Sequence, residues 1–81
     1  MSDSIEYQES DLQHRKSVLQ CKIKFYQWQI TGYEFAIASY QNENAEAFIV
    51  KAESELLEVK ERMLLTQNSL DKISQKLRGI E

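Results

Sequence analysis

Two side chains in this sequence have the chemistry for nucleophilic catalysis or for binding a transition metal. They are His14 and Cys21, and each residue type occurs once. A Cys–His dyad requires the two groups to meet, and a zinc site requires four ligands. The two residues are seven apart, and we expect them to point to different faces of a helix. The sequence therefore predicts no metal site and no Cys–His dyad within one chain.

The acidic residues offer no clearer site. Glu53, Glu55, Glu58 and Glu61 have the spacing of ordinary exposed helix residues. A di-iron bundle needs inward glutamates with a Glu-x-x-His motif, which this sequence does not contain. It also contains no phosphate-binding loop, nucleophile elbow or dinucleotide fingerprint. We therefore expect a protein that is not an enzyme, with no catalytic residues and no cofactor.

Basic and aromatic residues interleave in the segment KIKFYQWQ, from Lys22 to Gln29. Such a segment can bind single-stranded nucleic acid by stacking bases on aromatic rings. The aromatic residues follow helical spacing, however, so packing between helices explains them more simply. Nucleic-acid binding remains the alternative function, and its candidate contacts are Arg15, Lys16, Lys22 and Lys24.

Two apolar stripes run along the chain in steps of three and four residues, the period of coiled-coil helices. The first stripe consists of Leu19, Ile23, Tyr26, Ile30, Tyr33, Ile37 and Tyr40. The second consists of Ala45, Ile49, Ala52, Leu56, Val59, Met63, Thr66, Leu70, Ile73, Leu77 and Ile80. This pattern predicts an all-α protein, an antiparallel two-helix hairpin with helical coiled-coil packing. We expect one hairpin domain over residues 1–81, with helix one over about 5–40, a turn over 41–44 and helix two over about 45–78.

The two stripes also match in side-chain size. A fold near the middle of the turn pairs residues whose numbers sum to about 85. Tyr33 then faces Ala52, and Tyr40 faces Ala45. Large side chains opposite small ones fill the space between two helices without voids. The sequence therefore favours this register.

The end of helix two has its own signal. Lys76 and Arg78 suit the last turn of a helix, and Gly79 after them is typical of a helix stop.

A single continuous helix through Asn44 is the alternative to the hairpin. The turn sequence contains neither glycine nor proline, and asparagine lowers helix propensity without forbidding a helix.

Helix one carries a second apolar face on the side away from the predicted seam. We expect this face to be a partner interface, because a solvated face would carry polar residues instead. Its residues are Val18, Cys21, Phe25, Trp28, Gly32 and Phe35. A smaller apolar flank on helix two consists of Phe48, Val50, Leu57, Leu64 and Leu65. Together they predict a hairpin that dimerises into a four-helix bundle or binds another helical protein.

Charge and composition restrict the partners and the cellular compartment that we expect for this protein. The net charge of −3 does not demand nucleic acid as a partner. A single cysteine fits a reducing compartment, and the polar first residues exclude a secretory signal. No apolar run approaches the ~20 residues that cross a bilayer. We therefore expect a cytoplasmic protein without a membrane span. Its preferred function is a small protein–protein interaction module, such as an adaptor, co-chaperone or accessory protein of a bacterium or phage.

The expected architecture resembles several families of small helical hairpins. Type III secretion needle subunits are similar in length, but they have a proline in the turn, where this chain has QNEN. The WXG secreted proteins place Trp-x-Gly between their helices, whereas Trp28 and Gly32 lie four apart within helix one. The plasmid RNA-binding protein Rop is similar in architecture. Its likeness implies a dimeric four-helix bundle that binds nucleic acid through the basic open end of the hairpin.

Overall fold

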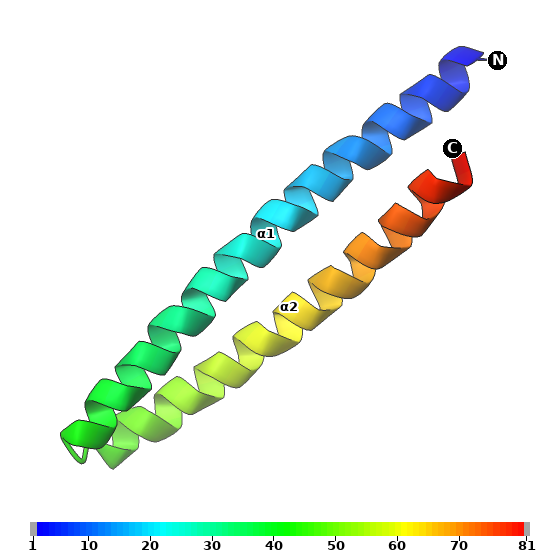
Figure 1. Cartoon of the computed structure of the whole chain (residues 1–81). Helices are drawn as coiled ribbons and strands as arrows, with labels where there is room; N and C mark the ends of the chain where they lie inside the picture. The colour runs from blue at the N-terminus through cyan, green and yellow to red at the C-terminus, as the bar shows by residue number, and fades with distance from the viewer. Residues whose placement is uncertain (1, 81) are drawn as a thin grey trace.

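The chain folds into two long α-helices that lie side by side and run in opposite directions (Figure 1). In the computed structural model, which describes residues 2–80, α1 spans Ser2–Asn42 and α2 spans Glu46–Ile80. The start of α1 and the end of α2 lie at one end of a rod that measures 64 × 14 × 14 Å (Figure 1). The predicted all-α hairpin is confirmed, and the alternative of one continuous helix is wrong.

The two helices meet along the predicted stripes. Every residue of both stripes is buried or half-buried, and the least exposed are Ile23, Ala52, Val59 and Leu77, at 5–9%. Apolar residues at steps of three and four stay on one side of a helix and face the neighbouring helix throughout its length. Among the described residues no side chain is less than 2% exposed. A pair of helices buries only one stripe each, so the core is thin.

Asn44 terminates α1 and allows the chain to reverse. Its φ of 57° is left-handed, a conformation that asparagine tolerates better than most residues. The Ala45 N–H donates to the Tyr40 carbonyl at 3.0 Å, and the Asn44 N–H donates to the Gln41 carbonyl at 3.3 Å. These two bonds satisfy carbonyls at the end of α1 that have no partner within the helix. Asn44 therefore adopts the left-handed conformation that glycine adopts at the ends of many helices.

The register of the two helices differs from the predicted one. The Tyr40 ring stacks on Phe48 with the ring centres 5.4 Å apart, and these residue numbers sum to 88. Tyr26 and Arg62, which also sum to 88, line one groove across the two helices. The side chains of these seam residues therefore contact α2 about three positions away from their predicted partners. The geometry of the turn, which the stripes do not specify, sets this offset.

The shift changes the neighbours of Tyr33, which was predicted to face Ala52. The half-buried Tyr33 ring lies near the carboxylates of Glu55 and Glu58. Its partial burial, followed by the negative charge of Glu55, raises the pKa of the Tyr33 hydroxyl above its usual value of 10.0. Ala52 stays in the seam and is only 6% exposed. The seam residues were predicted correctly, but their pairing across the seam was not.

The helices also extend further than predicted. Helix α1 begins at Ser2 rather than near residue 5, and α2 continues through Gly79 to Ile80. Gly79 has no positive φ, so the prediction that it stops the helix is wrong. A glycine in a helix costs only about 1 kcal/mol relative to alanine, and Ile80 is half-buried in the seam beyond it. Within residues 2–80, neither helix has a stretch long and apolar enough to cross a bilayer.

Candidate functional site

The surface of α1 that points away from α2 carries large apolar side chains. Trp28 is 81% exposed, Phe35 76% and Phe25 56%. Val18, Cys21 and Gly32 on the same face are also exposed. All six residues that the sequence predicted as an interface therefore share one uncovered surface, which we call the α1 outer face.

Gly32 leaves a hollow in the middle of this face. Apart from the two adjacent residues and the backbone of the helix itself, no heavy atom lies within 4 Å of the position that a Cβ would occupy there. Trp28, Thr31 and Phe35 border the hollow. A side chain from another helix can enter the space between the two rings, because only backbone forms its floor.

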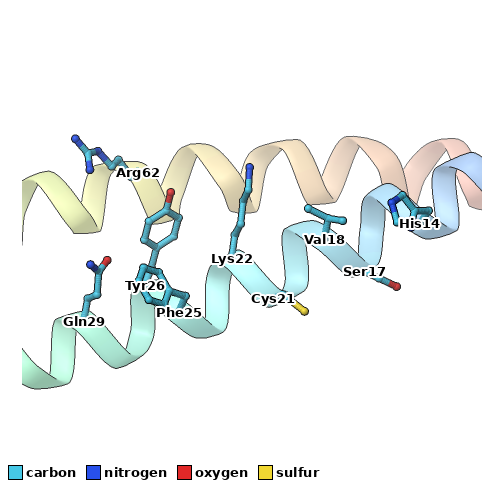
Figure 2. Close-up of a pocket in the computed structure, with 9 residues that line it drawn as sticks. All are labelled: His14, Ser17, Val18, Cys21, Lys22, Phe25, Tyr26, Gln29 and Arg62. Carbon is cyan, nitrogen blue, oxygen red and sulfur yellow. The ribbon is translucent and has the colours of Figure 1, made fainter.

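One edge of the α1 outer face borders a shallow groove of about 670 Å³ between the helices (Figure 2). Val18 and Phe25 line it from the outer face, and Figure 2 shows Lys22 and Tyr26 reaching toward α2. Arg62 closes the groove from α2, where its guanidinium lies 3.7 Å from Glu58. The groove joins apolar surface to two cationic side chains.

His14 and Cys21 both line this groove, so the prediction that they point to different faces is wrong. Seven residues are nearly two full helical turns, which returns the chain to the same side about 10 Å further along. At that distance the imidazole and the thiol cannot form a dyad. Among the residues that the structure describes, no group of three His, Cys, Asp or Glu side chains is placed to hold a metal ion. Cys21 is an exposed free thiol.

The four basic residues proposed as nucleic-acid contacts do not form one patch. Arg15 lies 3.1 Å from the Asp11 carboxylate, and Lys16 is half-buried on the seam side of α1. Lys22 lines the groove described above, whereas Lys24 lines a different groove. The helix therefore distributes these charges over several sides instead of presenting them to one ligand.

A second apolar surface runs along α2. Val50, Leu57 and Leu64 recur every seven residues and are 67%, 64% and 61% exposed. We call these three residues the α2 outer stripe. Phe48 and Leu65, which come immediately before the seam residues Ile49 and Thr66, are 60% and 67% exposed on the other side of α2. The sequence identified these residues as apolar but did not show how their surface is placed relative to the α1 outer face.

The two apolar surfaces lie toward opposite sides of the hairpin. In an antiparallel pair of helices, residues that come immediately before a seam residue in the sequence lie on one side of the hairpin. Residues that come immediately after a seam residue lie on the opposite side. The groove of Figure 2 has Phe25 and Arg62, which precede Tyr26 and Met63. The groove with Lys24 is lined by Gln20, Gln27 and Gln67, which all follow seam residues.

The same rule places the two apolar surfaces. Val18 and Phe25 of the α1 outer face precede seam residues, whereas Val50 and Leu57 of the α2 outer stripe follow them. The α1 outer face is therefore turned toward the side of the Figure 2 groove, and the α2 outer stripe toward the other side. A partner that covers one of them leaves the other bare.

Comparison with protein-family models, with curated proteins and with solved structures finds no match for this chain. Since a fold alone does not define a function, the function is argued from the surfaces of the hairpin.

Proposed function

We propose that this protein is a non-enzymatic interaction module that binds the apolar face of another helix through its α1 outer face. The observation that carries the proposal is the exposure of Phe25, Trp28 and Phe35 along one side of α1. Aromatic rings clustered on an exposed surface mark interaction sites, and tryptophan is enriched among the residues that dominate binding energy. An adaptor, co-chaperone or accessory protein acts in this way.

The three rings can supply a large part of the binding free energy of a specific complex. A Phe or Trp side chain buries ~150–250 Å² when it is fully covered. With the exposed fractions above, the three rings leave on the order of 400 Å² of apolar surface in water. Covering that area contributes about 10 kcal/mol at ~25 cal/mol per Å². Association costs ~4–15 kcal/mol, so further contacts must add to the rings.

A helix is the partner that best fits this surface. The α1 outer face is straight, narrow and repeats every three and four residues, as the hairpin's own seam does. A second hairpin would supply such a helix and complete a four-helix bundle. The thin core of the single hairpin supports this proposal, since a second layer of helices buries apolar surface that the monomer leaves in water.

Photo-crosslinking in the native cell tests the proposal directly. A photoreactive amino acid is placed at Trp28 in one variant and at Gln27 in the control. Both positions are exposed, but Gln27 lies on the side of the other groove. We expect a discrete crosslinked product from position 28 and none from position 27. Equal crosslinking from both positions, or none from position 28, would refute the α1 outer face as an interface.

A second candidate function is a dimeric nucleic-acid-binding regulator similar to Rop. The groove in Figure 2 favours it, because Lys22 and Arg62 lie beside the rings of Phe25 and Tyr26. Cationic side chains next to aromatic rings bind single strands by charge and stacking. A salt titration against generic RNA and DNA is the test, since phosphate contacts weaken steeply as salt rises. No binding at low salt removes this candidate.

A further inference from the structure

We propose that one flank of the hairpin binds the phosphates of a single-stranded nucleic acid through cationic side chains that both helices contribute. This proposal rests on the second candidate function, because it names the surface that contacts the strand. The surface differs from the four contacts predicted from the sequence, which all lie on helix one.

The seam defines the flank. Leu12 and Lys16 are half-buried and continue the α1 stripe in the same steps of four and three. Residues that come immediately before a seam residue lie on the side of the Figure 2 groove. A second groove on this side joins Leu12 to Lys76 of α2, and the Figure 2 groove joins Tyr26 to Arg62. Between Leu12 and Tyr26 the flank is about 21 Å long.

Cationic side chains collect on this flank. Residues 11–26 of α1 and 62–77 of α2 contain ten positions immediately before a seam residue, and five of these are cationic and one is acidic, a net charge of +4. The five cationic residues, which we call the basic flank, are all exposed: Arg15, Lys22, Arg62, Lys72 and Lys76. The ten positions immediately after the same seam residues include two cationic residues and one acidic residue, a net charge of +1. Charge therefore distinguishes the two sides of the hairpin.

Most of the basic flank has no partner within the hairpin. The ion pairs found within residues 2–80 join Arg15 to Asp11 at 3.1 Å and Arg62 to Glu58 at 3.7 Å. The three lysines of the basic flank lie outside these pairs, so they can bind phosphates without breaking an ion pair.

The flank becomes acidic toward the turn. Glu55 and Glu58 come immediately before the seam residues Leu56 and Val59, on the same side as the basic flank. Carboxylates repel a chain of phosphates. The strand is therefore confined to the half of the hairpin that contains the start of α1 and the end of α2.

Aromatic rings beside the cations favour a single strand over a duplex. Phe25 is 56% exposed, and its ring centre lies 6.4 Å from that of Tyr26. Figure 2 shows both rings in the same groove as Lys22 and Arg62. An exposed ring can stack an unpaired base while neighbouring cations hold the phosphates. The bases of a duplex are already stacked on one another, so only a single strand uses both features of this groove.

Two matched variants test the basic flank. One carries Lys22→Gln with Lys72→Gln, and the control carries Lys24→Gln with Lys60→Gln, at positions that follow seam residues and lie on the opposite side. All four lysines are exposed, and glutamine has a similar helix propensity, so both hairpins should keep their seam. Each variant loses two positive charges from the same net charge of −3. Circular dichroism checks that both variants fold.

The salt dependence of binding separates the two variants. The probe is a fluorescently labelled oligouridine, and fluorescence anisotropy measures its affinity over a range of salt concentrations. Each phosphate contact to a single strand contributes ~0.7 to the slope of log affinity against log salt, so contacts from all five cations give a slope of about −3.5. The control should keep this slope, whereas the variant of the basic flank should have a slope of about −2.1.

A third variant, Phe25→Leu, tests the stacking of a base. It should bind oligouridine about tenfold more weakly than the wild type, which corresponds to the loss of ~1.4 kcal/mol of stacking. Its salt slope should not change, because the substitution removes no charge. Its affinity for heparin, an anionic polymer without bases, should equal that of the wild type. These measurements are made at concentrations where sedimentation finds single hairpins.

Three results would overturn the proposal in distinguishable ways. If the variant of the basic flank and its control lose the same slope, this flank is not the contact surface, and the second candidate function stands without it. If Phe25→Leu changes the affinities for oligouridine and heparin equally, the ligand is an anionic polymer of any kind. If the wild type binds no oligouridine at low salt, the proposal and the second candidate function both fail. The crosslink from position 28 still decides the α1 outer face on its own.

Discussion

Replacing Val59 by alanine tests the seam against a matched exposed position on the same helix. Val59 is 5% exposed and faces α1, whereas Val50 is 67% exposed. The change to alanine removes two carbons, and their burial contributes about 1.5 kcal/mol at ~0.8 kcal/mol for each buried CH₂ group. Incomplete closure of the cavity adds to this loss. Alanine also improves helix propensity by roughly 0.5 kcal/mol at either position.

These contributions predict changes of opposite sign in the free energy of unfolding of the two variants. Val59→Ala should lower the free energy of unfolding by ~1 kcal/mol, and Val50→Ala should raise it by ~0.5 kcal/mol. The difference isolates burial, because helix propensity contributes equally to both. Urea denaturation followed by circular dichroism measures it, at concentrations where sedimentation finds single hairpins. Equal effects of the two substitutions would refute the assignment of Val59 to the seam.

The remaining predictions concern the seam, the turn and pH. Ala52→Leu should cost ~1–3 kcal/mol by overpacking a site that is 6% exposed, and an unchanged urea midpoint would contradict its place in the core. Asn44→Ala should cost about 1 kcal/mol because of the left-handed φ, whereas Asn44→Gly should be neutral or stabilising; the reverse order in urea midpoints would rule out the turn. The pKa of Tyr33 is raised in the folded state by partial burial and then by Glu55, so its contribution to stability is complete below about pH 10 and is lost as the pH rises further. Tyr33→Phe should flatten this alkaline loss in pH-dependent melting, and an identical loss in both proteins would count against the raised pKa.

The sequence was sufficient to predict which residues face the other helix. Steps of three and four specify a seam wherever they occur, so each predicted position from Leu19 to Tyr40 is buried or half-buried. The register of the two helices was harder to predict. The apolar stripes still face each other when one helix slides along the other by about one turn. The left-handed Asn44 and the two hydrogen bonds around it select the observed offset. The period of the stripes contains no information about that turn.

The candidate interface was predictable in part. Aromatic residues at helical spacing outside the seam identified the α1 outer face, and Trp28 and Phe35 are indeed among the most exposed large side chains. The spacing of seven already places His14 and Cys21 on one side of α1, because seven residues are nearly two full turns, and the prediction of different faces overlooked this. The opposite placement of the α2 outer stripe required the antiparallel arrangement first.

Quenching of Trp28 fluorescence by acrylamide across a dilution series tests most directly whether the α1 outer face is covered. The single tryptophan reports on the centre of that face and on nothing else. The account predicts strong quenching in dilute protein, where Trp28 is 81% exposed, and progressively weaker quenching as the concentration rises. The emission should shift to shorter wavelength over the same range. Quenching as strong as that of the unfolded chain at every concentration would contradict the claim that another copy covers this face.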